Sequence, residues 1–237
     1  MSVSVSLGII FFSALICALF QLSLGTLLLL YHSSLGRFVK KKTKSLASSF
    51  ISGVCLMSFL LLASSVFLDF ALFGSPLPKF VLCVFVGILV ALALIIWFLY
   101  FRPGKLKKDS TELWLPKKIS RFINSRARIT NDNSEAFSLG LLTVLGELPF
   151  TFILFLLSGA SILELPESLE VLALVVFSVF SVLPLIILRF AIRKGKTVVE
   201  VQRFRVRNKF FFKILTGFCF LILAAFIFAF KFFGGSL

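Results

Sequence analysis

Residues 141–155 read LLTVLGELPFTFILF, an apolar run with one carboxylic acid, Glu147, near its centre. The surrounding side chains are those of a membrane-spanning helix, which needs about 20 apolar residues to cross a hydrocarbon core of roughly 30 Å. A carboxyl group at mid-membrane costs roughly 3 kcal/mol or more, so it normally faces a bundle interior or a water-filled cavity. The stretch therefore predicts a membrane helix that carries a buried polar site.

The composition of the whole chain agrees with this interpretation. The 237 residues are 59% hydrophobic and include 32 Phe, while 15% are charged, compared with roughly 25% in soluble domains. The mean hydropathy is +1.08. These values exclude an ordinary soluble domain and predict an all-α integral membrane protein.

Six windows have the length and apolarity of transmembrane helices, whereas barrel strands would alternate over about ten residues. They cover residues 7–31, 47–70, 80–101, 137–159, 169–188 and 210–230. The first window has no preceding basic residue and no A-x-A-like cleavage site, so we interpret it as a span and not as a signal peptide.

The distribution of basic residues predicts the orientation of these helices. Residues 35–45 hold five of the 25 Lys and Arg, residues 102–135 hold nine, and residues 189–213 hold nine. Cytoplasmic loops carry an excess of Lys and Arg. We therefore expect these three loops in the cytoplasm, both termini outside, and a multi-pass protein of the cytoplasmic (plasma) membrane.

The same basic residues suggest a partner. A formal net charge of +15 is compatible with nucleic acid, but in a chain with six spans we interpret it as topogenic charge in contact with anionic lipid headgroups. Apolar residues at near-helical spacing between basic ones predict a short helix in the headgroup layer, or a helix that binds a protein partner. They are Leu115, Ile119, Phe122, Ile123 and Ile129.

The long central loop divides the chain into two sets of three helices. The predicted parts are a first three-helix repeat at residues 1–101, the basic cytoplasmic loop with its interfacial helix at 102–135, and a second three-helix repeat at 136–237. Because three is odd, the second set enters the membrane in the opposite sense, so a repeat here would be a 3+3 inverted repeat.

A short match between the halves supports such a repeat. The sequence LFQLS at residues 19–23 aligns with LGELP at 145–149, which pairs Gln21 with Glu147. We predict that Glu147, Gln21, Ser23 and Thr151 line one central site that binds a small solute, a proton or another ion. The structural alternative is that Glu147 and Gln21 only hold helices together by hydrogen bonding.

Four residues are candidates for helix breaks that would shape this site. Pro149 removes a backbone hydrogen bond near Leu145 and favours a kink there. Gly146 and Gly25 thin or interrupt their helices beside the site, and Pro184 is expected to bend the fifth helix.

Other polar and small residues receive structural interpretations. Asp69 is expected to be a solvated cap at the external end of the second helix. Gly53 and Gly140 are expected to let neighbouring helices approach closely.

No pattern for catalysis is present. The cysteines, Cys17, Cys55, Cys83 and Cys219, form no C-x-x-C pair, so a thiol relay is disfavoured. The chain also lacks a phosphate-binding loop, a zinc-protease motif and a nucleophile elbow. We therefore expect no enzyme activity, no cofactor and no metal; a homo-oligomer is left open.

Several short stretches resemble the lysine-exporter superfamily, which also takes in the transmembrane thiol-transfer proteins of cytochrome c maturation. They are QLSLG in the first helix, the basic turn with Leu35, Gly36 and Arg37, Gly53, AFSLG, and LGELP in the fourth helix. The resemblance implies a six-helix 3+3 inverted repeat with outside termini. It covers most of the chain in topology and about a dozen positions in sequence.

The chain departs from both branches of that group. Ser23, Leu24 and Gly25 stand where the exporters typically carry a Pro-Gly-Pro-like break, and Glu147-Leu148-Pro149 stands where the thiol-transfer members carry Cys-Pro. The sequence thus favours a transporter or exporter of a small solute or ion. The alternatives are a non-transporting membrane scaffold or assembly factor and, third, a thiol-electron carrier.

Overall fold

The computed structural model describes residues 3–24, 40–74, 78–100, 122–123, 125–127, 129–130, 132–193 and 207–230. Within these residues the chain is helical and contains no strand, which confirms the all-α prediction. The long helices are α1 (Val3–Leu24), α3 (Lys40–Phe73), α4 (Lys79–Tyr100), α6 (Asn133–Ile162), α7 (Glu167–Arg193) and α9 (Lys209–Phe228).

Five of these helices, α1, α3, α4, α6 and α7, are long and apolar enough to cross a membrane. This finding fits a multi-pass membrane protein. The sixth predicted span corresponds to α9, whose apolar part, Ile214–Phe228, is shorter in the described chain.

The predicted windows locate the helices but not their ends. The second window was expected to begin at residue 47, whereas α3 begins at Lys40. The sequence KKKTKS that opens α3 contains no Pro or Gly, and Lys is a good helix former. A hydropathy window therefore marks the apolar part of a helix, not its start.

The far end of α3 has a recognisable stop signal. Gly74 follows the helix with a φ of 66°, and its backbone N–H donates to the carbonyl oxygen of Phe70 at 3.1 Å. This left-handed conformation is the usual way a helix ends at glycine.

Helices α3 and α6 make the most extensive helix–helix contact, and they run parallel, because Gly53 faces Phe137 and, farther along both helices, Asp69 faces Gly159. A Cβ atom on Gly53 would meet the carbonyl oxygen of Phe137, and one on Gly140 would meet that of Phe50. Farther along both helices, Gly159 lies against the backbone of Ser65. The close approach expected at Gly53 and Gly140 is thus present.

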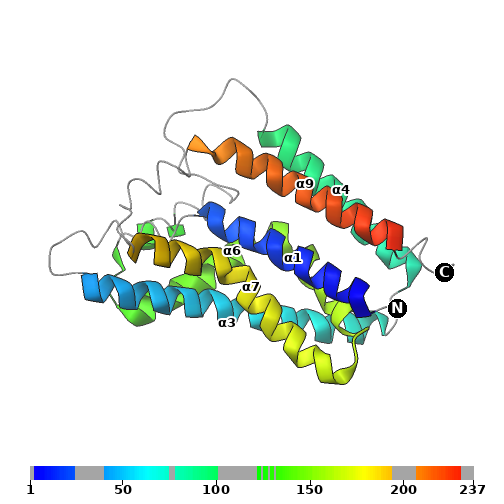
Figure 1. Ribbon diagram of the computed structural model, residues 1–237, viewed down its shortest axis with the longest axis horizontal. Coiled ribbons are helices and arrows are strands. Elements are labelled where there is room, and N and C mark those ends of the chain that lie inside the picture. The colour runs from blue at the N-terminus through cyan, green and yellow to red at the C-terminus, as the bar shows by residue number, and fades with distance from the viewer. Residues whose placement is uncertain are drawn as a thin grey trace.

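Helix α1 packs against α6, α7 and α9, and it lies between the α4–α9 pair and the other three helices (Figure 1). It runs antiparallel to α6, because Ser6 bonds to Glu164 at one end of the pair while Gln21 bonds to Glu147 nearer the other. Helices α4 and α9 meet where the Trp97 ring lies against Gly217.

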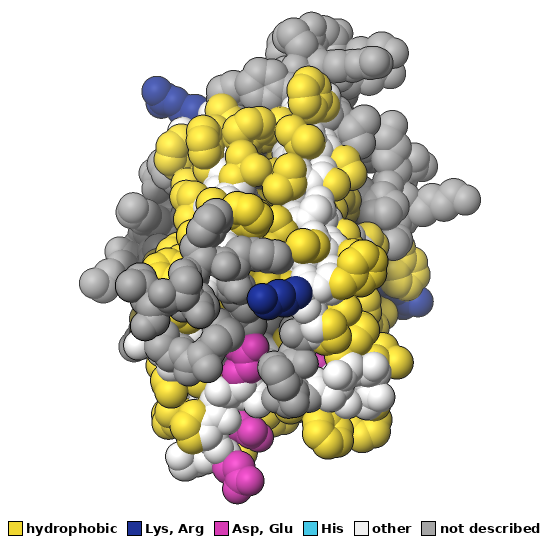
Figure 2. Space-filling model, turned by 90° about the vertical axis from the view of Figure 1, so that its right-hand side faces the viewer, with side chains coloured by type: hydrophobic (Ala, Val, Ile, Leu, Met, Phe, Trp, Pro, Cys, Tyr) yellow, Lys and Arg dark blue, Asp and Glu magenta, His cyan; other side chains and the backbone are white. Residues whose placement is uncertain are grey.

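We name the two ends of this bundle by their charge. The acidic end is where α1 begins and α9 ends (Figure 1), and it includes Glu164 of the α6–α7 turn with Glu167 and Glu170 in the first turn of α7. The basic end is where α3 and α6 begin, next to the residues around Arg126. Figure 2 looks onto the acidic end, where acidic side chains gather toward one edge and hydrophobic ones cover much of the rest.

Large apolar side chains cover the outside of the bundle. Phe67 and Phe98 are each 73% exposed and Phe80 is 78% exposed. Soluble monomers rarely expose apolar surface on this scale, whereas lipid tails would cover it.

The predicted interfacial helix is described only in part. Residues 122–123, 125–127 and 129 are helical; Ile123 and Ala127 face inward, while Phe122 and Ile129 are exposed. Leu115 and Ile119 lie outside the described residues.

Candidate functional site

Glu147 and Gln21 meet in the interior of the bundle. The Gln21 side-chain Nε2 donates a hydrogen bond to Glu147 Oε2 at 2.8 Å, and this bond joins α1 to α6. Both side chains are buried, at 4% and 3% exposure. The structure therefore brings together the two residues that the short match between the halves had paired.

The positions of these residues follow from the packing of their helices. Gln21 lies in the last turn of α1, and Glu147 lies midway along α6. Cys17, one turn before Gln21, is buried on the same side of α1. The ring of Phe20, the residue directly before Gln21, stacks with that of Phe150 at 6.1 Å between centroids. The pair is thus enclosed by apolar groups, where electrostatic interactions are strong.

Thr151, another predicted site residue, lies one turn along α6 from Glu147. It is buried, and its hydroxyl donates to the backbone carbonyl oxygen of Glu147 at 3.1 Å. The hydroxyl is therefore beside the site but already has a partner in its own helix.

The remaining predicted residues have mixed outcomes. The side chain of Ser23 and all of Gly25 lie outside the described residues. Gly146 is buried next to Glu147. Helix α6 is assigned as helical through Pro149, and α7 through Pro184, so any effect of these prolines is a bend within a continuous helix.

The Gln21–Glu147 pair leaves two hydrogen-bonding atoms unused. Gln21 Oε1 and Glu147 Oε1 are buried and have no hydrogen-bond partner among the described residues. Such groups cost about 1–3 kcal/mol each when left unmet, and in native proteins they usually have a reason. Each of these oxygen atoms can accept a hydrogen bond or coordinate a small cation.

Asp69 corrects one expectation. It is 0% exposed, so it is not a solvated cap. Its Oδ2 atom faces Gly159 of α6, where an added Cβ would lie 2.7 Å away. The sequence position near the helix end suggested water access, but the close packing of α3 on α6 reaches this residue at Gly159 and buries it.

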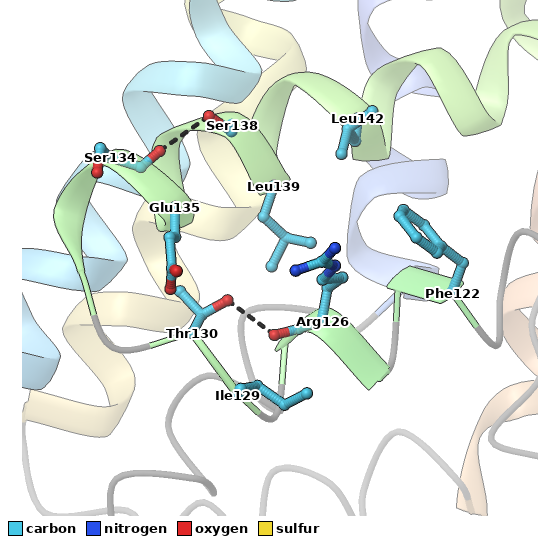
Figure 3. Close-up of a pocket in the computed structure, with 9 residues that line it drawn as sticks. All are labelled: Phe122, Arg126, Ile129, Thr130, Ser134, Glu135, Ser138, Leu139 and Leu142. Carbon is cyan, nitrogen blue, oxygen red and sulfur yellow. Dashed lines mark hydrogen bonds between the residues drawn. The ribbon is translucent and has the colours of Figure 1, made fainter.

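A separate groove lies at the basic end, between the short helix near residue 126 and the start of α6 (Figure 3). It has a volume of about 330 Å³. Polar and apolar side chains line it, and Arg126 and Glu135 come from opposite walls. Neither Gln21 nor Glu147 lines this groove, so it is distinct from the buried pair.

Two buried hydroxyl groups without an obvious sequence signal, those of Ser13 and Ser158, lie two to three turns from the pair along α1 and α6. Both side chains are fully buried, and neither Oγ atom has a hydrogen-bond partner among the described residues. A helical count could have marked Ser13, because Ser6, Ser13 and Gln21 recur every seven or eight residues on one face of α1.

The cysteines show no pairing. All four are free thiols; Cys17 is buried and Cys83 is exposed.

In comparisons with family models, curated proteins and solved structures, the chain matches none of them.

Proposed function

We propose that the protein is a membrane transporter or exporter of a small solute or ion, and that Glu147 and Gln21 form its central binding site. The observation that carries the proposal is the buried hydrogen bond between these two side chains. Polar and ionisable residues inside membrane helices are expensive and mark substrate or ion pathways by default. Transporter sites typically lie near the midplane between two repeats.

The pattern of helix contacts supports an inverted repeat. An exchange of the halves would replace α1 by α6, α3 by α7 and α4 by α9. The pairs α1–α6, α3–α7 and α4–α9, which this exchange leaves unchanged, are all in contact. The α3–α6 contact becomes the α7–α1 contact, and α4–α6 becomes α9–α1, and all four pairs are present.

One contact does not follow the pattern. The slight contact between α6 and α7 is not matched by one of similar extent between α1 and α3, as far as the described residues go. The rest of the helix pairing is what a pseudo-two-fold axis in the membrane plane would produce.

The Gln21–Glu147 bond adds an independent argument. Residues that a two-fold axis interchanges can touch each other only if both lie next to the axis. The match of LFQLS with LGELP makes Gln21 and Glu147 equivalent, and their side chains are 2.8 Å apart. The site would thus lie on the axis, where the two halves must move relative to each other.

The proposed topology has six spans, with α9 as the last, and places both termini and the acidic end outside. The support is the charge distribution, since residues 35–45, 102–135 and 189–213 hold most of the 25 Lys and Arg. These basic loops would contact anionic lipid headgroups. The architecture is the one implied by the resemblance to the lysine-exporter superfamily, which we retain as part of the proposal.

A mechanism follows from the unused acceptors. When one half rocks against the other, the Gln21–Glu147 hydrogen bond opens, and a proton or cationic group takes its place at the Glu147 carboxylate. When the ligand leaves, Gln21 again donates to Glu147. The hydrogen bond would thus act as a closed latch for the empty site.

The test is solute-dependent flux. Purified protein is reconstituted into liposomes containing a pH-sensitive dye, and a panel of amino acids and small cations is added in turn. The proposal expects at least one solute to change the internal pH faster than in protein-free liposomes. If no solute does so while the protein remains folded, the scaffold alternative takes the place of transport.

A further inference from the structure

Beyond the central pair, the buried polar atoms without partners are concentrated in one part of the bundle. Apart from Trp97 Nε1, those that remain belong to Ser13 on α1, Asp69 on α3 and Ser158 on α6. Helices α1 and α3 both pack against α6. Buried polar groups in native proteins are nearly always paired, often with ordered water, so these groups call for a common explanation.

Among these groups, the carboxyl group of Asp69 has the highest free-energy cost of burial. Both of its carboxyl oxygens lack a hydrogen-bond partner of good geometry among the described residues, although the backbone of Ala160 is close. No described basic side chain pairs with it. The other charged residues that the structure describes at this end are Glu164 of the α6–α7 turn, Glu167 and Glu170 in the first turn of α7, and Lys79 at the start of α4. A carboxyl group in this setting must hold a proton or a cation, because the uncompensated charge would be too costly.

Ser158 connects Asp69 to the face of α6 that carries Glu147. It precedes Gly159, the residue against which Asp69 packs. It also lies eleven residues after Glu147, which is close to three full turns, so both side chains leave α6 in nearly the same direction. The distance along the helix between them is about 16 Å.

The α1–α6 contact fills the interval. The bonds Gln21–Glu147 and Ser6–Glu164 fix the antiparallel register, which places Cys17 opposite Thr151 and Ser13 opposite the turn before Ser158. Successive polar groups are then separated by about 6 Å along the helices. One or two water molecules can bridge such a gap by hydrogen bonding.

We propose that Gln21, Cys17, Ser13, Ser158 and Asp69 form a hydrated proton path that connects Glu147 with the acidic end. We call it the α1–α6 path. Asp69 is its outer proton-binding site, buried but only about one turn from the end of α3 at Phe73. The proposal deepens the proposed function, on which it rests for the role of Glu147.

Protons are conserved along this path. The Asp69 carboxyl releases its proton to a water molecule, each water passes one proton to the next acceptor, and the last donates to Glu147. Asp69 is then reprotonated from the acidic end. The hydroxyls of Ser13 and Ser158 both accept and donate a hydrogen bond, so they can hold the water chain in order.

The test follows hydrogen–deuterium exchange of the Glu147 carboxyl by infrared spectroscopy. A protonated carboxyl has a C=O band separate from that of a carboxylate, and the band shifts when deuterium replaces the proton. Glu147→Gln and Asp69→Asn identify the two bands in protein reconstituted into nanodiscs. Exchange is then started by mixing with D2O, with no transported solute present.

Ser158→Ala, Ser13→Ala and Asp69→Asn should each slow exchange at Glu147 by about tenfold, which corresponds to the loss of one hydrogen-bonding station worth about 1.4 kcal/mol. The matched control is Ser161→Ala, because Ser161 is also buried on α6 but its hydroxyl donates to the Leu157 carbonyl oxygen at 2.8 Å. It should leave the exchange rate unchanged.

Unchanged exchange at Glu147 in all three folded variants would overturn the proposal, as would the absence of an Asp69-dependent protonated band. The proposed function is tested separately, because exchange is measured without solute. If exchange at Glu147 depends on Asp69 but no solute is transported, the path stands and the transport function is wrong. If solute is transported but the three variants exchange as fast as the unchanged protein, the transport function stands and the path is wrong.

Discussion

At the scale of single residues, one hydrogen bond accounts for the glutamate in an apolar run. Gln21 donates to one oxygen of Glu147, which removes part of the cost of burying a carboxyl group. The second oxygen has no described partner. A bond that served only to hold two helices together would be expected to satisfy both oxygens, so the half-used carboxyl group favours a binding role.

The Gln21–Glu147 pair should be coupled in stability. Gln21→Leu removes the donor and leaves the Glu147 carboxyl buried without a partner, which should lower the free energy of unfolding by about 1–3 kcal/mol. Replacing both residues by Leu should cost less than the sum of the two single changes. The measurement is a double-mutant cycle by unfolding in mixed detergent micelles, and additive changes would show that the bond contributes nothing.

At the scale of helices, close packing between α3 and α6 positions the site. Gly53 and Gly140 let the two backbones approach until each glycine faces a carbonyl oxygen of the other helix. The sequence predicted this role, because small residues at such positions are typical of membrane helix contacts. It did not predict that the same contact would extend as far as Asp69 and bury it.

Gly53→Ala should therefore destabilise the protein by about 1–3 kcal/mol, as overpacked contacts do, because the new methyl group would meet the Phe137 carbonyl oxygen. The matched control is Gly87→Ala on α4. Among the described residues, no atom beyond the neighbouring backbone of α4 lies within 4 Å of a Cβ at that position, and alanine is the better helix former by about 1 kcal/mol. The measurement is thermal unfolding in detergent, in which the Tm of Gly53→Ala should be lower than that of the unchanged protein and the Tm of Gly87→Ala should not. Equal Tm values for the two variants would contradict the close approach of α3 and α6 at Gly53.

Pro149 offers a second test at this scale. Pro149→Ala adds a backbone N–H that can bond to the Leu145 carbonyl oxygen, so α6 should straighten next to Glu147. The exposed proline ring makes few packing contacts to lose. We expect equal or higher Tm together with weaker solute-dependent flux. Full flux with a raised Tm would show that a bend at Pro149 has no part in the mechanism.

At the scale of the whole molecule, sequence patterns predicted the helices and the pairing of Gln21 with Glu147. Hydropathy could predict the helices because lipid allows few alternatives to apolar helices, whereas the pairing came from the match of LFQLS with LGELP. It could not predict the path of buried hydroxyls, because Ser13 and Ser158 become significant only once α1 and α6 are set in register. The burial of Asp69 likewise depends on a neighbouring helix and not on its position within α3.

The topology predicts which loops reagents can reach. In a version with all four cysteines replaced, a cysteine introduced at Glu167 should react with an impermeant thiol reagent added outside cells, and one at Lys117 should be protected until the membrane is opened. The proposed topology keeps the basic loops inside, because Lys and Arg resist translocation. Reaction at Lys117 with protection at Glu167 would reverse the orientation.

The most direct test of the central claim is the effect of Glu147→Gln on solute-dependent proton flux in proteoliposomes. This change keeps the shape of the side chain and its hydrogen bond with Gln21 but removes the group that binds and releases a proton. The matched control is Glu135→Gln, the same change at an exposed position in the first turn of α6. We predict that Glu147→Gln abolishes proton flux at equal reconstituted amounts, whereas Glu135→Gln leaves it near that of the unchanged protein. Proton flux in Glu147→Gln equal to that of the unchanged protein would contradict the claim and reduce the buried glutamate to a structural contact between α1 and α6.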